Sequence, residues 1–173
     1  MQFEIVLSLK EHCYVEAIGL SNVNAQMLLR AIEIGGTPEQ GGIVSVQNEF
    51  SPRYRLWADV IDICTQYGIA YLPWAPLGGA GSFSKIATGE MGVFNVIAEQ
   101  RGVSPYAITI AWHLAQFPTS IPIPGASNSA SILDSLVGTT IQLTADEIAE
   151  LNHSCPPDGP LEGELLDLPK FRA

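Results

Sequence analysis

The stretch Ile121-Pro-Ile-Pro-Gly-Ala-Ser-Asn128, followed by Ser129-Ala-Ser-Ile-Leu-Asp-Ser-Leu136, predicts a strand, a tight loop and the start of a helix. The N-terminus of a helix carries unpaired backbone N–H groups and about half a positive charge, so it can bind an anion. Gly125 and Ala126 would let a ligand come close to the backbone. We therefore expect a phosphate-bearing cofactor to place its phosphate here, although an ordinary strand-to-helix turn explains the spacing as well.

The rest of the chain repeats this alternation of strand and helix. Short apolar runs predict strands at residues 15–20, 43–46, 69–74 and 120–123. Helical patterns, with expected caps at Asn22, Ser104 and Thr144, occur at residues 1–12, 24–34, 56–67, 94–101, 106–117 and 129–136 and around Ile148 and Leu151. Because every strand is apolar and every connection is long enough for a helical crossover, the pattern favours an α/β fold with four parallel βα units and a C-terminal helix.

Composition limits the class of protein. The 173 residues are 47% apolar and 15% charged, which is typical of a globular chain with one domain. A net charge of −10 argues against binding to nucleic acid or to an anionic membrane, and no apolar run is long enough for a membrane span. The first ten residues lack a signal-peptide pattern, and three scattered cysteines indicate reduced thiols, so we expect a cytoplasmic protein. Neither the cysteines nor the three histidines have the spacing of metal ligands.

Polar or aromatic residues follow each predicted strand at its carboxyl end, where parallel α/β folds bind ligands. These residues are Ser21, Asn22, Gln47, Trp74, Ser127 and Asn128. Each has an ordinary structural explanation, because Ser and Asn cap helices and tryptophan often packs in a core. Their coincidence at four strand ends favours a shared binding site.

With these residues in place, the chain resembles the C-terminal half of an aldo-keto reductase. The resemblance runs from about Leu9 to Leu151. The stretches that carry it are Ala17-Ile-Gly-Leu-Ser-Asn22, Val46-Gln-Asn-Glu49, Trp74-Ala-Pro-Leu-Gly-Gly79 and Ile121-Pro-Ile-Pro-Gly125. The resemblance implies a partial TIM (β/α)8 barrel containing strands five to eight, and a family reaction in which NADPH reduces aldehydes or ketones.

The resemblance also implies roles for individual residues in binding NADP. Ser21, Asn22 and Gln47 match the positions that hold the nicotinamide carboxamide, and Trp74 matches the aromatic residue on which the ring stacks. The residues that match the loop over the pyrophosphate are Ala75, Leu77, Gly78 and Gly79. The residues that match the 2′-phosphate loop are Gly125, Ala126, Ser127 and Asn128, and Asp134 matches a carboxylate near the adenine.

Two departures from the family pattern matter. No Lys or Arg lies between Arg101 and Lys170, so we expect a weaker preference for NADPH, with NAD as an alternative cofactor. The catalytic Asp, Tyr, Lys and His of the family lie on the first four strands and have no counterpart here. Since His12, His113 and His153 show no positioned partner, we assign no catalytic residue and expect this chain alone to be inactive.

Several alternatives remain open at this stage. The chain could be an oxidoreductase domain at residues 1–153 with an acidic, proline-rich tail at residues 154–173. It could be a non-catalytic nucleotide-binding or scaffold module, or a truncated gene product. It could also be a half-barrel that is completed by a second copy or by a separate N-terminal half. Two open sheet edges and apolar side chains facing the barrel interior would make self-association favourable.

Overall fold

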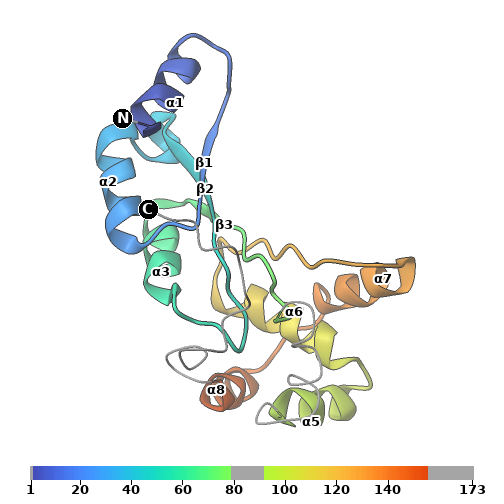
Figure 1. Ribbon diagram of the computed structural model, residues 1–173. Coiled ribbons are helices and arrows are strands. Elements are labelled where there is room, and N and C mark those ends of the chain that lie inside the picture. The colour runs from blue at the N-terminus through green and yellow to red at the C-terminus, as the bar shows by residue number, and fades with distance from the viewer. Residues whose placement is uncertain (1, 79–91, 156–173) are drawn as a thin grey trace, which may run out of the picture.

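The computed structural model describes residues 2–78 and 92–155, in which strands and helices alternate along the chain (Figure 1). The strands are β1 (Ile18–Ser21), β2 (Ile43–Gln47) and β3 (Ala70–Tyr71), and they form a parallel sheet in that order. The helices are α1 (Gln2–Glu11), α2 (Ala25–Gly35), α3 (Ala58–Tyr67), α5 (Gly92–Arg101), α6 (Pro105–Gln116), α7 (Ser129–Gly138) and α8 (Ala145–Ser154). A short 3-10 helix, η1 (Pro38–Gln40), precedes β2. The predicted α/β fold with a parallel sheet is therefore confirmed.

The fourth predicted strand, at residues 120–123, is reduced to two parallel bridges beside β3. Ser120 pairs with Tyr71, and Ile123 pairs with Trp74. The backbone N–H of Ile121 donates to the Tyr71 carbonyl at 2.8 Å, and that of Ile123 donates to the Pro73 carbonyl at 3.2 Å. Pro122 and Pro124 have no N–H to donate, which prevents a regular ladder on the other side of this segment. The prediction of four full strands was wrong, but the predicted order and direction hold.

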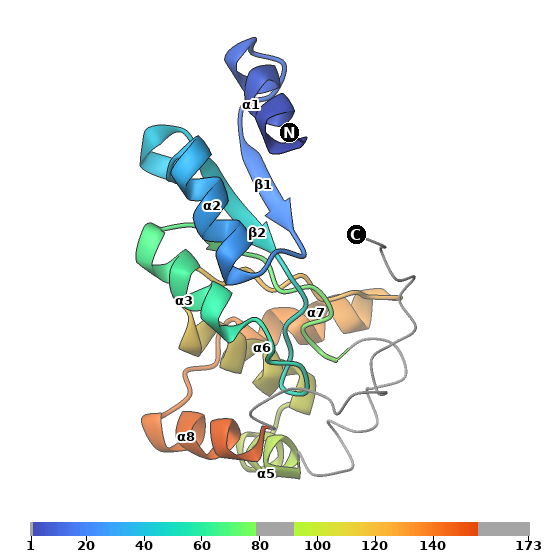
Figure 2. The same cartoon turned by 60° about the vertical axis from the view of Figure 1, so that its left-hand side comes forward.

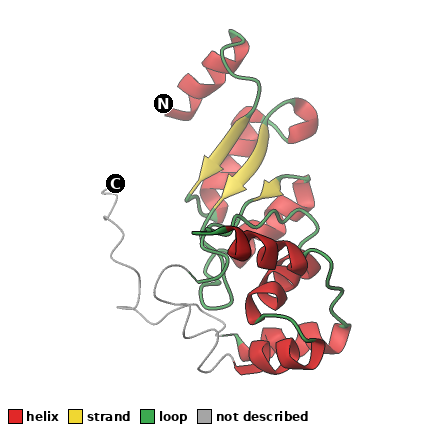
Figure 3. Cartoon of the chain, turned by 90° about the vertical axis from the view of Figure 1, so that its right-hand side faces the viewer, coloured by secondary structure: helices red, strands yellow, loops and turns green. Residues whose placement is uncertain are grey.

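The helices cover one face of the sheet, and Figure 3 shows helices behind the strands of the sheet, and α2 and α3 contact β2 and β3. Ile18, Val46 and Tyr71 point to that side and are buried. On the opposite face, Gly19 pairs with Ser45, and a Cβ added to Gly19 would lie only 2.5 Å from Ser45 Oγ. Small and polar residues therefore face the open side of the sheet, although the predicted strands are mostly apolar. Sequential strand order with helices on one face is the arrangement found in a barrel segment.

The core between sheet and helices is centred on aromatic rings. Phe50 stacks on Trp112 with ring centroids 5.8 Å apart and meets Tyr71 edge-on at 6.3 Å. The indole N–H of Trp112 donates to Asn152 Oδ1 at 2.9 Å, which ties α6 to α8. All three rings are buried, so this cluster fixes the position of α6 under the sheet.

The helix starts follow local signals in the sequence. Ser104 and Thr144 accept hydrogen bonds from backbone N–H groups in the first turns of α6 and α8, as predicted. Asn128 caps α7 in the same way. The expected cap of α2 was wrong by two residues, because Asn24 Oδ1 accepts from the Met27 N–H at 2.8 Å and the Asn22 side chain bonds to Trp74 instead.

No helix in the described part of the chain is long and apolar enough to cross a membrane.

Helix α7 packs on α6 through small and polar residues. Gly138 is buried at this contact, and Ser104 Oγ donates to Asp134 Oδ2 at 2.6 Å. The apolar stripe of α7 points outward instead, with exposed fractions of 53% at Ile132, 64% at Leu133 and 54% at Leu136. An apolar cleft of about 410 Å³ lies between this stripe, α6 and residues 120–126.

Replacing Gly138 with alanine is expected to lower the free energy of unfolding. An added Cβ would lie 2.6 Å from the Ala107 carbonyl oxygen and 2.7 Å from Ile110 Cβ, so α6 and α7 would have to separate. We expect a loss of about 1–3 kcal/mol, as for other overpacked contacts. Urea unfolding would measure it, with Gly92→Ala as the control because no atom of the described part of the chain lies within 4 Å of a Cβ there. Equal effects of the two substitutions would contradict this packing.

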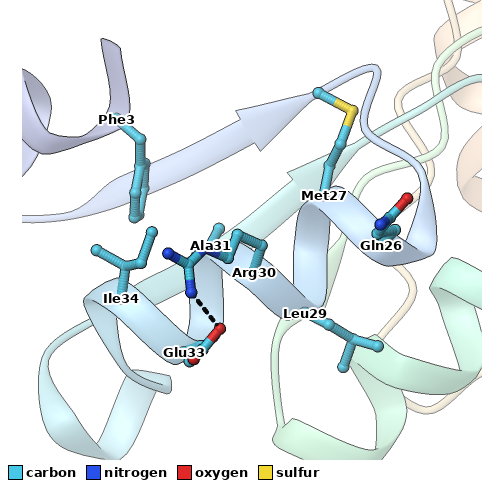
Figure 4. A pocket seen from close by; sticks show the side chains of 8 residues that line it. All are labelled: Phe3, Gln26, Met27, Leu29, Arg30, Ala31, Glu33 and Ile34. Atoms are coloured by element: carbon cyan, nitrogen blue, oxygen red, sulfur yellow. Dashed lines mark hydrogen bonds and ion pairs between the residues drawn. The ribbon is translucent and has the colours of Figure 1, made fainter. Parts of the chain in front are cut away.

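The edge of the sheet at β1, opposite the segment at residues 120–123, is apolar as well. Beside β1, helices α1 and α2 form a groove of about 630 Å³, and Figure 4 shows Phe3 of α1 pointing toward Ile34 of α2. Met27 and Leu29 on α2 are 54% and 45% exposed, although Leu28 between them is fully buried. A helix that is apolar around most of its circumference is normally covered on more than one side. Both edges of the sheet therefore present helices with uncovered apolar faces.

Candidate binding site at the carboxyl ends of the strands

The structure brings four predicted site residues together where β1, β2 and β3 end. Figure 2 shows β1 and β2 side by side with their arrowheads at the same end. Ser21 Oγ donates to the Gln47 carbonyl at 3.0 Å, and the Asn22 N–H donates to the same carbonyl at 3.1 Å. From the next strand end, the indole N–H of Trp74 donates to Asn22 Oδ1 at 3.1 Å. These contacts join positions 21, 22, 47 and 74 into one cluster.

The cluster keeps hydrogen-bonding capacity for a ligand. Gln47 is exposed, and neither its carboxamide nor Asn22 Nδ2 has a hydrogen-bond partner among residues 2–78 and 92–155. Trp74 is half-buried, and its indole is held edge-on by Asn22. Amide donors and acceptors of this kind can pair with another carboxamide, and an oriented indole can stack on a planar ring.

Backbone strain gathers at the same strand ends. Asn22 and Ala75 have φ angles of 54° and 49°, in the left-handed region that non-glycine residues seldom adopt. Each such residue costs of the order of 1 kcal/mol, and such residues are common at ligand-binding positions. The turn after β3 is closed by a bond from the Gly78 N–H to the Ala75 carbonyl at 2.8 Å. Two strained turns thus border the cluster.

Asn48 connects the backbone segments that carry the cluster, and the sequence analysis did not identify it as a candidate site residue. Its side chain is fully buried, accepts from the Val23 N–H at 3.0 Å and donates to the Val23 carbonyl at 2.7 Å. Its own carbonyl accepts from the Trp74 N–H at 3.0 Å. Asn48 therefore connects the turns after β1, β2 and β3. The signal was present in the strand alternation, because Asn48 lies two residues after buried Val46 and must be buried on the same side.

His113 was expected to pack or to face solvent, and it is fully buried in α6. Its Nε2 lies 2.9 Å from the Pro76 carbonyl oxygen, which can only accept, so Nε2 carries the proton. Its Nδ1 is buried and has no hydrogen-bond partner among residues 2–78 and 92–155. Burial lowers the pKa of His113 from 6.5 to about 4, although the bond to Pro76 opposes this shift. The imidazole is neutral at pH 7 and anchors the turn after β3.

The loop at residues 125–128 is exposed and leads directly into α7. Asn128 Oδ1 accepts from the Ser131 N–H at 2.9 Å, and its Nδ2 donates to Ser127 Oγ at 3.4 Å. No atom of the described residues lies within 4 Å of a Cβ added to Gly125, so these residues leave the approach to the helix start open. Trp74 pairs with Ile123, which places this loop just beyond the fourth strand end.

The other predicted site residues are less accessible. Leu77 and Gly78 are buried in the turn after β3. Asp134 is half-buried and paired with Ser104, so it is not a simple solvated helix residue. Gly79 lies outside the described residues. Within residues 2–78 and 92–155, no three His, Cys, Asp or Glu side chains are grouped to hold a metal ion.

Comparisons with known proteins agree on one family. A family model described as "Aldo/keto reductase family" matches residues 2–154. An uncharacterized oxidoreductase of Schizosaccharomyces pombe is 28% identical over 151 residues, covering 87% of this chain and 46% of that protein. Pyridoxine 4-dehydrogenase of Escherichia coli is 28% identical over 148 residues, covering 86% of this chain and 48% of that enzyme. The chain thus spans about half the length of the curated relatives it matches.

A solved structure shares the fold at lower sequence identity. The aldo/keto reductase of Klebsiella pneumoniae, in complex with NADP and acetate, superposes with a TM-score of 0.74 at 19% identity. The match covers 96% of this chain and 56% of that one. The family match over nearly the whole described structure agrees with the resemblance seen in the sequence, and the chain belongs to the aldo/keto reductase family.

Proposed function

We propose that the carboxyl ends of the strands bind a nicotinamide dinucleotide for the carbonyl reduction typical of the family. The observation that carries the proposal is the cluster in which Ser21, Asn22 and Gln47 meet the indole of Trp74. In this arrangement, Asn22 Nδ2 and the Gln47 carboxamide bind the nicotinamide carboxamide, and Trp74 stacks on the ring. Holding the carboxamide fixes which face of the ring is presented for hydride transfer.

The phosphates bind between the turn after β3 and the N-terminus of α7. Ala75, Leu77, Gly78 and Gly79 shape the loop beside the pyrophosphate, mainly through their backbone. The 2′-phosphate binds at Gly125, Ala126, Ser127 and Asn128, where hydroxyl groups and the first N–H groups of α7 face it. Asp134 lies one turn further along α7, toward the adenine. NADP is the proposed cofactor, and NAD is also accepted because no Lys or Arg occurs at residues 102–169.

The two apolar edges support a partner that completes a barrel around this site. The described residues supply no acid of the family's catalytic set, so the proposed partner brings those residues. The proposed partner is a complementary N-terminal half or a second copy of this chain, and the proposed domain extends over residues 1–153.

The charge of the 125–128 loop gives a test of the phosphate site. Replacing Ser127 with arginine would add a charge-assisted hydrogen bond to the 2′-phosphate, worth about 1.5–3 kcal/mol. We expect the preference for NADPH over NADH to rise about tenfold or more, as measured by calorimetric titration with both nucleotides. Thr65→Arg, on an exposed position of α3, adds the same charge away from the site and should leave the ratio unchanged. A ratio that rises equally in both variants, or in neither, would contradict the placement of the phosphate.

A further inference from the structure

His113 is the one imidazole among the described residues that is fully buried, and it lies under the proposed cofactor site. Its ring meets Phe50 edge-on at a centroid distance of 5.8 Å and Trp112 at 4.9 Å. On the remaining side, Nε2 lies 2.9 Å from the carbonyl oxygen of Pro76. Apolar rings therefore hold the imidazole in one orientation, with its N–H aimed at the turn after β3.

A histidine at this position is costly in the absence of a role. A buried polar atom without a partner destabilises the folded state, and Nδ1 is such an atom among the described residues. An apolar side chain of similar size would pack against the same rings without that cost. Residues that break a local rule in this way tend to serve the site they support.

The turn that His113 contacts is bonded to the rest of the fold at its start, through Trp74, and in its middle, through Pro76. It starts at Trp74, passes through left-handed Ala75 and is closed by one internal bond, from the Gly78 N–H to the Ala75 carbonyl. Pro76 has no N–H, so its backbone can bond to the rest of the fold only through its carbonyl, whereas Trp74 is bonded to the Asn48 carbonyl and the Phe50 N–H. The His113 Nε2–H donates to the Pro76 carbonyl.

We infer that His113 is a positioning residue that fixes the Trp74–Gly78 turn through the Pro76 carbonyl and so sets the indole and pyrophosphate loop for the dinucleotide. The dinucleotide in this inference rests on the proposed function, whereas the effect of His113 on the turn does not depend on that function. His113 touches neither cofactor nor substrate. It acts through the backbone of the turn.

Three substitutions separate the hydrogen bond from packing. Leucine removes the donor, glutamine places a donor N–H where Nε2 lies, and asparagine is too short to reach the carbonyl. Thr109→Ala is a matched control, because it removes a different buried bond on α6, from Thr109 Oγ1 to the Pro105 carbonyl. Hydrogen exchange of the Gly78 amide reports on the turn, while the Leu72 and Ile121 amides report on the sheet.

We expect His113→Leu and His113→Asn to speed Gly78 exchange about tenfold relative to the Leu72 and Ile121 amides, and to weaken NADPH binding by a similar factor. His113→Gln and Thr109→Ala should retain slow exchange and binding. Equal acceleration at all three amides, or no difference between Gln and Asn, would overturn the inference. If the exchange pattern holds but the unmodified protein binds no NADPH, the role in the turn stands and the proposed function fails.

Discussion

The substitution Asn48→Ala is expected to cost about 2–5 kcal/mol of unfolding free energy. It would leave the buried N–H and carbonyl of Val23 without their partners, which lie 3.0 and 2.7 Å from the Asn48 side chain. Each unpaired buried group costs about 1–3 kcal/mol, and a domain is stable by only about 5–15 kcal/mol. Because Asn48 also links the turn before α2 to Trp74, dinucleotide binding should weaken beyond the effect of unfolding.

Urea unfolding at pH 7 would measure this loss, and Asn24→Ala provides the matched control. Asn24 is the same residue type and lies in the turn that the Asn48 side chain contacts, but it is exposed and only caps α2. Losing such a cap costs about 1 kcal/mol. If Asn48→Ala is no more destabilising than Asn24→Ala, Asn48 does not hold the strand ends together.

The second large expected effect is a lower free energy of unfolding in mild acid, because His113 is buried as a neutral imidazole. Burial lowers its pKa to about 4 in the folded protein, from 6.5 in the unfolded chain. Below pH 6.5 the His113 imidazole binds a proton in the unfolded state but stays neutral in the folded state. The free energy of unfolding therefore falls as the pH drops and levels off near pH 4. At about 1.4 kcal/mol per tenfold difference in proton affinity, the loss between pH 7 and pH 4 is about 3 kcal/mol.

His113→Gln isolates this contribution, because glutamine keeps the donor to Pro76 but does not titrate. The difference in unfolding free energy between the unmodified protein and this variant should change by about 3 kcal/mol from pH 7 to pH 4. Glu147, whose pKa is lowered to about 2 by its hydrogen bonds from Arg101, contributes equally to both proteins. A difference that stays constant with pH would show that His113 is not buried as a neutral imidazole.

The sequence predicted those features that depend on neighbouring residues. Ser104 and Thr144 cap their helices because each reaches an N–H three residues away. The alternation of strands and helices followed from apolar spacing, and the positions of Ser21, Gln47 and Trp74 at strand ends followed from it. The placement of a candidate site at one end of the sheet was therefore predictable from local patterns.

Features that depend on distant contacts were missed. Asn22 looked like a helix cap, but its partner is Trp74, 52 residues away, and the nearer Asn24 supplies the cap. His113 bonds to Pro76 across 37 residues, and no local pattern marks its orientation. The fourth strand was overestimated because its apolar spacing is regular, while Pro122 and Pro124 remove the donors that a ladder needs.

Fluorescence of Trp74 during a titration with NADPH tests directly whether a dinucleotide binds at the carboxyl ends of the strands. Trp74 would lie against the nicotinamide, whereas Trp112 is buried in the core. We expect saturable quenching in the unmodified protein that is mostly lost in Trp74→Phe, with free N-acetyltryptophanamide as the control for light absorption by the nucleotide. A flat titration of the folded protein, or equal quenching in Trp74→Phe, would contradict a dinucleotide site at the carboxyl ends of these strands.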